Sequence, residues 1–252
     1  MDFPQLEELF MRNLRLYHHP VALFFEADGP SRFQPTYRAK NRLSFCQFLA
    51  FAREYGGAVF MEADRLACST AADLFGFKEE RLKATKALAG YMPREEAERF
   101  YQARPRLAPG SCSGVGLAPL SQAQEPPDVV VFTVDALQAT HLLDFYVAGV
   151  GCSEVTLTHH VNGAACGNSI KAFTLGTPQL ALPCPGAFTS GKMDRSEMLL
   201  AFPWEALTAC AGILERRAAK GRVSLLGGPT LVGMDVCRNC PLIKFEKIGE
   251  PH

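Results

Sequence analysis

The sequence lacks an excess of charge of either sign, an export signal and a long apolar run. Its 26 basic residues balance 26 acidic ones without a basic run, which argues against nucleic acid as a partner. Residues 1–8 are acidic and contain no apolar segment flanked by positive charge, so we expect no signal peptide and a cytoplasmic location. The longest uncharged stretch, residues 173–191, is broken by three prolines, so we expect no membrane span.

Hydrolase signatures are missing as well. No Gly-x-Ser-x-Gly occurs, and no cysteine has a histidine partner that the sequence alone can place. Cysteine, by contrast, is plentiful, with nine in 252 residues. In a chain without an export signal, cysteines are more often ligands, reactive thiols or core residues than disulfides.

Apolar periodicity and caps predict an α/β protein with a mixed sheet and flanking helices. The chief expected helices are residues 4–16, 44–56, 78–89, 94–103, 135–148 and 203–221, with shorter ones after Cys68 and Cys166. The expected strands are residues 20–25, 58–61, 114–118, 128–132, 154–158 and 198–202. We expect one α/β domain over residues 1–221 and a C-terminal tail over residues 222–252.

The order of elements also predicts an internal duplication. Halves at about residues 17–92 and 110–192 each run strand, helix, strand, cysteine and helix, which suggests two pseudo-symmetric βαβ-type halves. In this alignment Cys68 corresponds to Cys166. Both would then approach one axis and face a shared site.

Cysteines cluster at predicted helix starts. Cys46 lies in the first turn of the helix that the capping box of Ser44 and Gln47 begins, and Cys68 and Cys166 each precede or open a helix. A thiol at a helix N-terminus is favoured as thiolate, which suits a metal ligand or a nucleophile. Cys184 adds a fourth soft ligand, the number that a tetrahedral zinc site or a four-iron cluster needs. The intervals of 22, 98 and 18 residues match no compact ligand motif, so these cysteines meet only if the fold brings them together.

A set of short segments, taken in order from about residue 10 to about residue 215, resembles the prokaryotic ArCR family, which is common in archaea and anaerobic bacteria. The segments are Pro20-Val21-Ala22, Phe45-Cys46-Gln47, Ala67-Cys68, Pro127-Asp128-Val129-Val130, Ala165-Cys166 and Leu182-Pro183-Cys184. The resemblance implies family cysteines at Cys46, Cys68, Cys166 and Cys184, which we call the cysteine quartet. The family's anaerobic distribution favours an iron–sulfur cluster over zinc, but the family name carries no activity.

Three functional hypotheses follow. In the first, the quartet binds a metal or an iron–sulfur cluster in anaerobic metabolism, for electron transfer with a redox partner protein or for reduction of a small molecule bound between the halves. In the second, a non-catalytic carrier or sensor module uses the thiols to hold zinc or a small ligand. In the third, the thiols are only core residues. An oligomer is compatible with all three hypotheses.

Four further residues have weaker signals. Cys237 and Cys240 form a single CxxC in the tail, which would ligate a second metal, join the main site or have no role. His160 is a candidate ligand or proton donor near Cys166. Cys210 falls on the apolar side of the last helix and is expected to be core.

Overall fold

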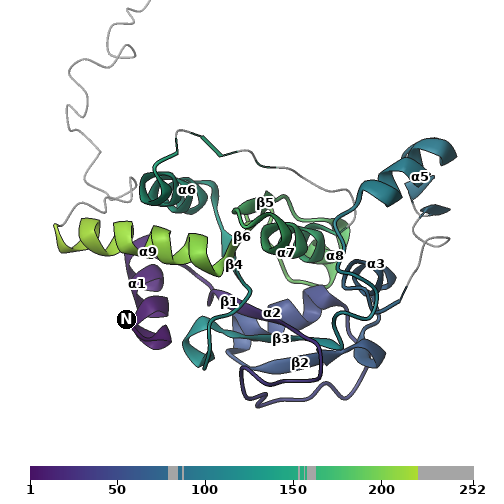
Figure 1. The fold of residues 1–252 in the computed structure, drawn as a ribbon, viewed down its shortest axis with the longest axis horizontal. Coiled ribbons are helices and arrows are strands. Elements are labelled where there is room, and N and C mark those ends of the chain that lie inside the picture. Colours follow the sequence, from purple (N-terminus) through teal and green to yellow (C-terminus); the bar gives the residue numbers. More distant parts are fainter. Residues whose placement is uncertain (79–84, 87, 153, 156, 158–162, 221–252) are drawn as a thin grey trace, which may run out of the picture.

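A computed structural model of the chain describes residues 1–78, 85–86, 88–152, 154–155, 157 and 163–220 (Figure 1). The α-helices are α1 (Phe3–Leu14), α2 (Phe45–Tyr55), α3 (Ser69–Leu74), α5 (Arg94–Ala103), α6 (Ala136–Val150), α7 (Ala164–Leu175), α8 (Pro185–Thr189) and α9 (Trp204–Ala219). The strands are β1 (Val21–Glu26), β2 (Val59–Glu62), β3 (Gly114–Pro119), β4 (Val129–Val134), β5 (Gln179–Ala181) and β6 (Met198–Pro203). None of these helices combines the length and apolarity needed to cross a membrane.

The strands form one sheet in the order β2-β3-β1-β4-β6-β5. Every pair of neighbours is antiparallel, including the central pair β1 and β4. Because β3 is antiparallel to both β1 and β2, these two strands run parallel to each other with β3 between them. β4 and β5 flank β6 in the same way. The fold is α/β with flanking helices, as predicted, but the sheet is antiparallel throughout and not mixed.

The sheet places the cysteines in a different correspondence from the expected one. Cys68 follows β2 and Cys184 follows β5, whereas Cys46 and Cys166 open the helices that precede those strands. If the halves are duplicated, this element order pairs Cys68 with Cys184, whereas the predicted pairing was with Cys166. The duplication itself stays a prediction.

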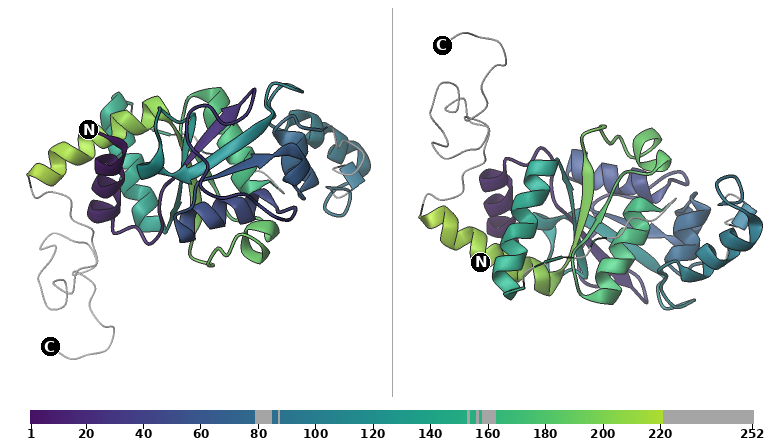
Figure 2. Two further views of the ribbon diagram at one scale, coloured as in Figure 1. Left: turned by 90° about the horizontal axis from the view of Figure 1, so that it is seen from below. Right: turned by 90° about the horizontal axis from the view of Figure 1, so that it is seen from above.

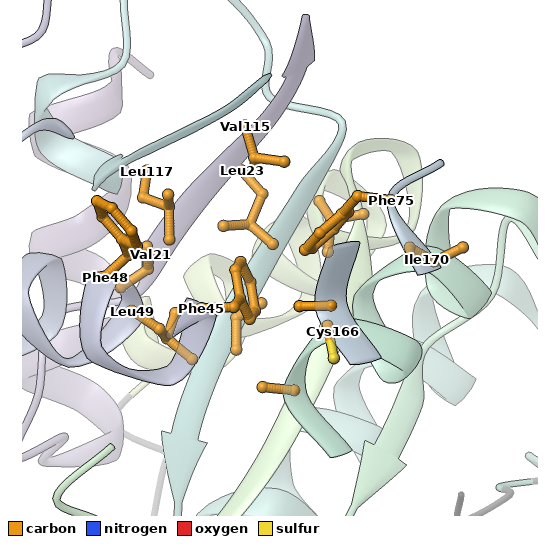
Figure 3. Packing of buried hydrophobic residues seen from close by; sticks show 14 of the residues in the cluster. Val21, Leu23, Phe45, Phe48, Leu49, Phe75, Val115, Leu117, Cys166 and Ile170 are labelled. Atoms are coloured by element: carbon orange, nitrogen blue, oxygen red, sulfur yellow. The ribbon is translucent and has the colours of Figure 1, made fainter. Parts of the chain in front are cut away.

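Helices cover both faces of the sheet, as the two views of Figure 2 show. Strand alternation explains the two cores: Val21 and Leu23 of β1 enter one core, and Ala22 and Phe24 enter the other. The first core, shown in Figure 3, contains residues of α2, α3, α7 and α8. The second contains residues of α1, α6 and α9. All four cysteines of the quartet belong to helices of the first face or precede them directly.

Three local expectations were wrong. The described residues of the expected strand 154–158, which are residues 154, 155 and 157, lie outside any strand. The three-residue strand β5 was not predicted, since it is too short for a periodic signal. The short helix α8 after Cys184 was not predicted either, although Pro185 at its first position is preset for a helical turn.

Candidate functional site

All four cysteines of the quartet lie in the first turn or at the N-cap of a helix on one face of the sheet. Cys46 is the second residue of α2, Cys166 is the third of α7, and Cys68 and Cys184 are the N-caps of α3 and α8. Figure 1 shows these four helices grouped on the same side. The fold therefore assembles what the sequence spacing alone leaves separate.

Local sequence explains how two of these helices begin. At α2, Ser44 and Gln47 form a reciprocal capping box with bonds of 3.2 and 2.8 Å, as predicted. At α7 the N-cap is Gly163, with a φ of 124°. A methyl group there would lie 3.1 Å from Leu74 and 3.3 Å from Nη2 of Arg104, so both the backbone angle and the space favour glycine.

Cys46 and Cys184 affect each other's pKa more than any other group does. The thiol of Cys46 donates a hydrogen bond to Sγ of Cys184, which lowers the pKa of Cys184 to about 4. The backbone N–H groups of Gly163, Ala164 and Ala187 also bond this sulfur and favour its anionic form. The same hydrogen bond raises the pKa of Cys46, with further increases from burial and from the neighbouring cysteines. At neutral pH the pair is one thiol and one thiolate.

Cys166 is the most enclosed member of the quartet. It is buried in the first core with Phe45 and Phe75 (Figure 3). Burial raises the pKa of Cys166, the charges of Cys68 and Cys184 raise it further, and the positive charge of Arg104 opposes them. The mutual charge effects among the cysteines show that all four form one neighbourhood.

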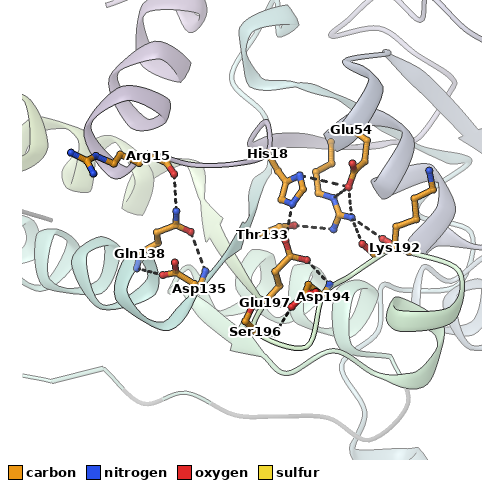
Figure 4. A network of polar contacts seen from close by, with 12 residues as sticks. Arg15, His18, Glu54, Thr133, Asp135, Gln138, Lys192, Asp194, Ser196 and Glu197 are labelled. Carbon is orange, nitrogen blue, oxygen red and sulfur yellow. Dashed lines mark hydrogen bonds and ion pairs between the residues drawn. The ribbon is translucent and has the colours of Figure 1, made fainter. Parts of the chain in front are cut away.

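A buried arginine holds the segment after α8 against α2. The guanidinium of Arg53 donates to the backbone oxygens of Gly191 and Lys192, at 2.9 and 3.1 Å. It also donates to Oγ1 of Thr133 on β4, at 3.3 Å, and pairs with Glu54 at 2.6 Å (Figure 4). An added methyl group on Gly191 would lie 3.1 Å from Cβ of Cys46. Arg53 thereby fixes the chain that follows Cys184 next to Cys46.

The quartet offers sulfur ligands but not a closed coordination shell. Within the described part of the chain, no group of three or more histidine, cysteine, aspartate or glutamate side chains is placed to hold a metal ion. Charge effects between thiols extend well beyond a metal–sulfur bond of about 2.3 Å, so this finding and the mutual pKa effects agree. The site as placed is a cluster of interacting thiols with one thiolate.

The other predicted residues separate into two groups. Cys210 is buried in the second core, as expected, and burial raises the pKa of its thiol. His160, Cys237 and Cys240, together with the whole tail 222–252, lie outside the described residues.

The role of Arg53 was not predicted from the sequence. A charged residue four positions after Leu49, on the apolar stripe of α2, was the signal that could have identified it.

The chain was compared with known proteins. A family model described as uncharacterised ArCR matches residues 9–212, which includes the whole quartet. No curated protein and no solved structure matches the chain.

Proposed function

This chain belongs to the uncharacterised ArCR family, and we propose that its cysteine quartet binds a metal centre, most specifically an iron–sulfur cluster, for electron transfer or reduction of a small molecule. The observation that carries the proposal is the gathering of four thiols from four helix starts at one place. Four cysteine ligands are the common requirement of tetrahedral zinc sites and of four-iron clusters.

The chemistry of the donor set fits a cationic centre. A metal is bound by thiolates, so each thiol must lose a proton on binding. Cys184 has already done so at neutral pH, because Cys46 and three backbone N–H groups stabilise its charge. The positive ends of α2 and α7 favour thiolates at Cys46 and Cys166, but burial and the neighbouring cysteines outweigh them and raise both pKa values. A bound cation would therefore have to displace these two protons. Of these three cysteines, Cys184 alone is therefore ready to ligate a cation before one binds.

The exposure of the cysteines supports an electron-transfer role. Cys166 is 4% exposed, whereas Cys46, Cys68 and Cys184 are partly exposed. A centre held by this set would be anchored in the core on one side and reachable from solvent on the other. When bound, an iron–sulfur cluster would supply a one-electron carrier, and the protein's part is to hold it and to control its access to solvent.

The experiment is metal and acid-labile sulfide analysis, with an absorption spectrum, on the full chain purified without oxygen. We expect iron, sulfide and a broad visible band, all lost in Cys166→Ala. The matched control is Cys210→Ala, which removes another buried thiol from the opposite core and should keep the metal. Protein that stays colourless after anaerobic reconstitution with iron and sulfide contradicts the cluster. Stoichiometric zinc without visible absorption supports the carrier or sensor hypothesis instead.

A further inference from the structure

A cavity of about 490 Å³ opens beside Cys68. Most of the described residues that line it fall between residues 63 and 78, with Leu66, Cys68 and Phe77 among them, and Arg42 is the one from outside that segment. Its volume lies in the range of small-molecule sites in proteins. Cys68 is thus shared between this cavity and the cysteine quartet.

Backbone pairing fixes the position of Arg42. The segment around Leu43 runs beside the segment around Leu66 as an isolated parallel bridge. Two backbone hydrogen bonds, from Leu43 to Arg65 and from Ala67 to Leu43, hold it at 2.9 and 2.8 Å. Nη2 of Arg42 then donates to the backbone oxygen of Leu66 at 2.7 Å. One edge of the guanidinium is therefore anchored on the cavity wall.

Among the described residues that line the cavity, two side chains are basic and one is acidic. Arg42 and Lys78 both line it, against the single carboxylate of Asp64. Asp64 pairs with Arg65, which lies outside the cavity lining, at 3.7 Å. Across the residues that the structure describes, Arg42 has no carboxylate within ion-pair distance. Its planar N–H groups match the oxygens of a carboxylate or a phosphate.

We propose that this cavity binds a small organic molecule carrying a carboxylate or a phosphate, with Arg42 pairing to the anion and the rest of the molecule lying against Cys68. The binding rests on the cavity alone. The further step, that this molecule is the substrate of the quartet, rests on the function proposed above. It deepens that function by assigning an anionic substrate class.

The test uses the metal-free full chain and two alkylating probes of similar size, anionic iodoacetate and neutral iodoacetamide. In both reactions the Cys68 thiolate displaces iodide, a sulfur–carbon bond forms and a carbon–iodine bond breaks. The rate of the iodoacetate reaction at Cys68 is divided by the rate of the iodoacetamide reaction, both measured by mass spectrometry. This ratio is compared with a reference, the same ratio for 2-mercaptoethanol, an uncharged thiol. Because both probes react with the same thiolate, the ratio reports only how differently the site treats the two probes.

We expect the ratio at Cys68 to exceed the 2-mercaptoethanol ratio about fivefold. One exposed charge pair about 4 Å apart contributes about 1 kcal/mol, which corresponds to about a fivefold change in rate. Arg42→Gln should bring the ratio close to the reference, and Arg42→Lys should restore much of it. The matched control is Arg38→Gln, which removes a nearby exposed charge paired with Glu62 outside the cavity. Acetate and inorganic phosphate, added separately at constant ionic strength, should slow the iodoacetate reaction and show which anion is preferred.

A ratio equal to the reference, a ratio that Arg42→Gln leaves unchanged, or a Cys68 that reacts with neither probe would overturn the inference. None of these results bears on metal binding. Conversely, if the protein holds no metal after anaerobic reconstitution, the proposed metal centre is contradicted, but the result of this binding test still stands.

Discussion

Replacing Cys46 by alanine should change how the reactivity of the Cys184 thiol depends on pH in the metal-free protein. The thiol of Cys46 is the largest cause that lowers the pKa of Cys184 to about 4. Without it, desolvation is opposed only by the three backbone N–H donors, and the pKa rises toward the ordinary value of 9.0. At pH 5 the thiolate fraction would fall from about 90% to between about 1% and about 0.01%, for variant pKa values of about 7 and about 9.

The expected rate change is smaller than the change in thiolate fraction. A more basic thiolate attacks disulfides faster, with a Brønsted coefficient of about 0.4–0.5. This raises the rate constant of the thiolate by about one to two orders of magnitude and offsets part of the loss in thiolate fraction. The net fall in the rate at pH 5 is therefore between about 5-fold and about 50-fold. The shape of the profile is more diagnostic. The rate at Cys184 should be nearly flat above about pH 5 in the parent, but should rise about tenfold per pH unit in the variant until its pKa is reached.

The assay is exchange with dithiodipyridine between pH 4 and 8. Cys184 is read from its tryptic peptide, residues 172–192, which contains no other cysteine. Cys46→Ser is the matched control, because its hydroxyl can donate the same hydrogen bond and should keep the profile flat. If Cys46→Ala retains a flat profile at Cys184, or if the parent already rises tenfold per unit, the assigned hydrogen bond is refuted.

Three further predictions concern stability, measured by urea unfolding. Arg53→Met should cost about 3–5 kcal/mol, because it leaves the buried carbonyl of Gly191 without its donor, and a loss below about 1 kcal/mol would contradict this role. Gly116→Ala should cost about 1–3 kcal/mol, because the new methyl carbon would overlap the buried ring of Phe33; an unchanged midpoint would show that the ring moves freely. In metal-free protein, the thiolate of Cys184 should add stability that is full above pH 9 and declines as pH falls to about 4, by at most about 1.4 kcal/mol per pH unit. Cys184→Ser should lack this contribution, and an identical pH profile in that variant would refute it.

Sequence patterns predicted the elements that have strong local signals. The capping box at Ser44 marks the start of α2, and the apolar run from Val129 marks β4. Elements with weak local signals were not predicted, and the reason is physical. β5 has three residues, and its place in the sheet comes from pairing with β6, not from its own propensity.

The site was predicted in composition but not in arrangement. Sequence identified the four cysteines and placed three of them beside helix starts, and the structure shows all four at such positions. The contact between Cys46 and Cys184 depends on the strand order, which places α2 and α8 on one face. The roles of Arg53 and Arg42 depend on backbone carbonyls that lie far away in the sequence or across an isolated bridge. No local pattern contains that information.

The most direct test of the central claim is iron and acid-labile sulfide analysis, with an absorption spectrum, on the full chain purified without oxygen. The account predicts iron and sulfide with a broad visible band in the parent and in Cys210→Ala, and their loss in Cys166→Ala. Colourless, metal-free protein after reconstitution, or colour that survives in Cys166→Ala, would contradict a metal centre held by the cysteine quartet.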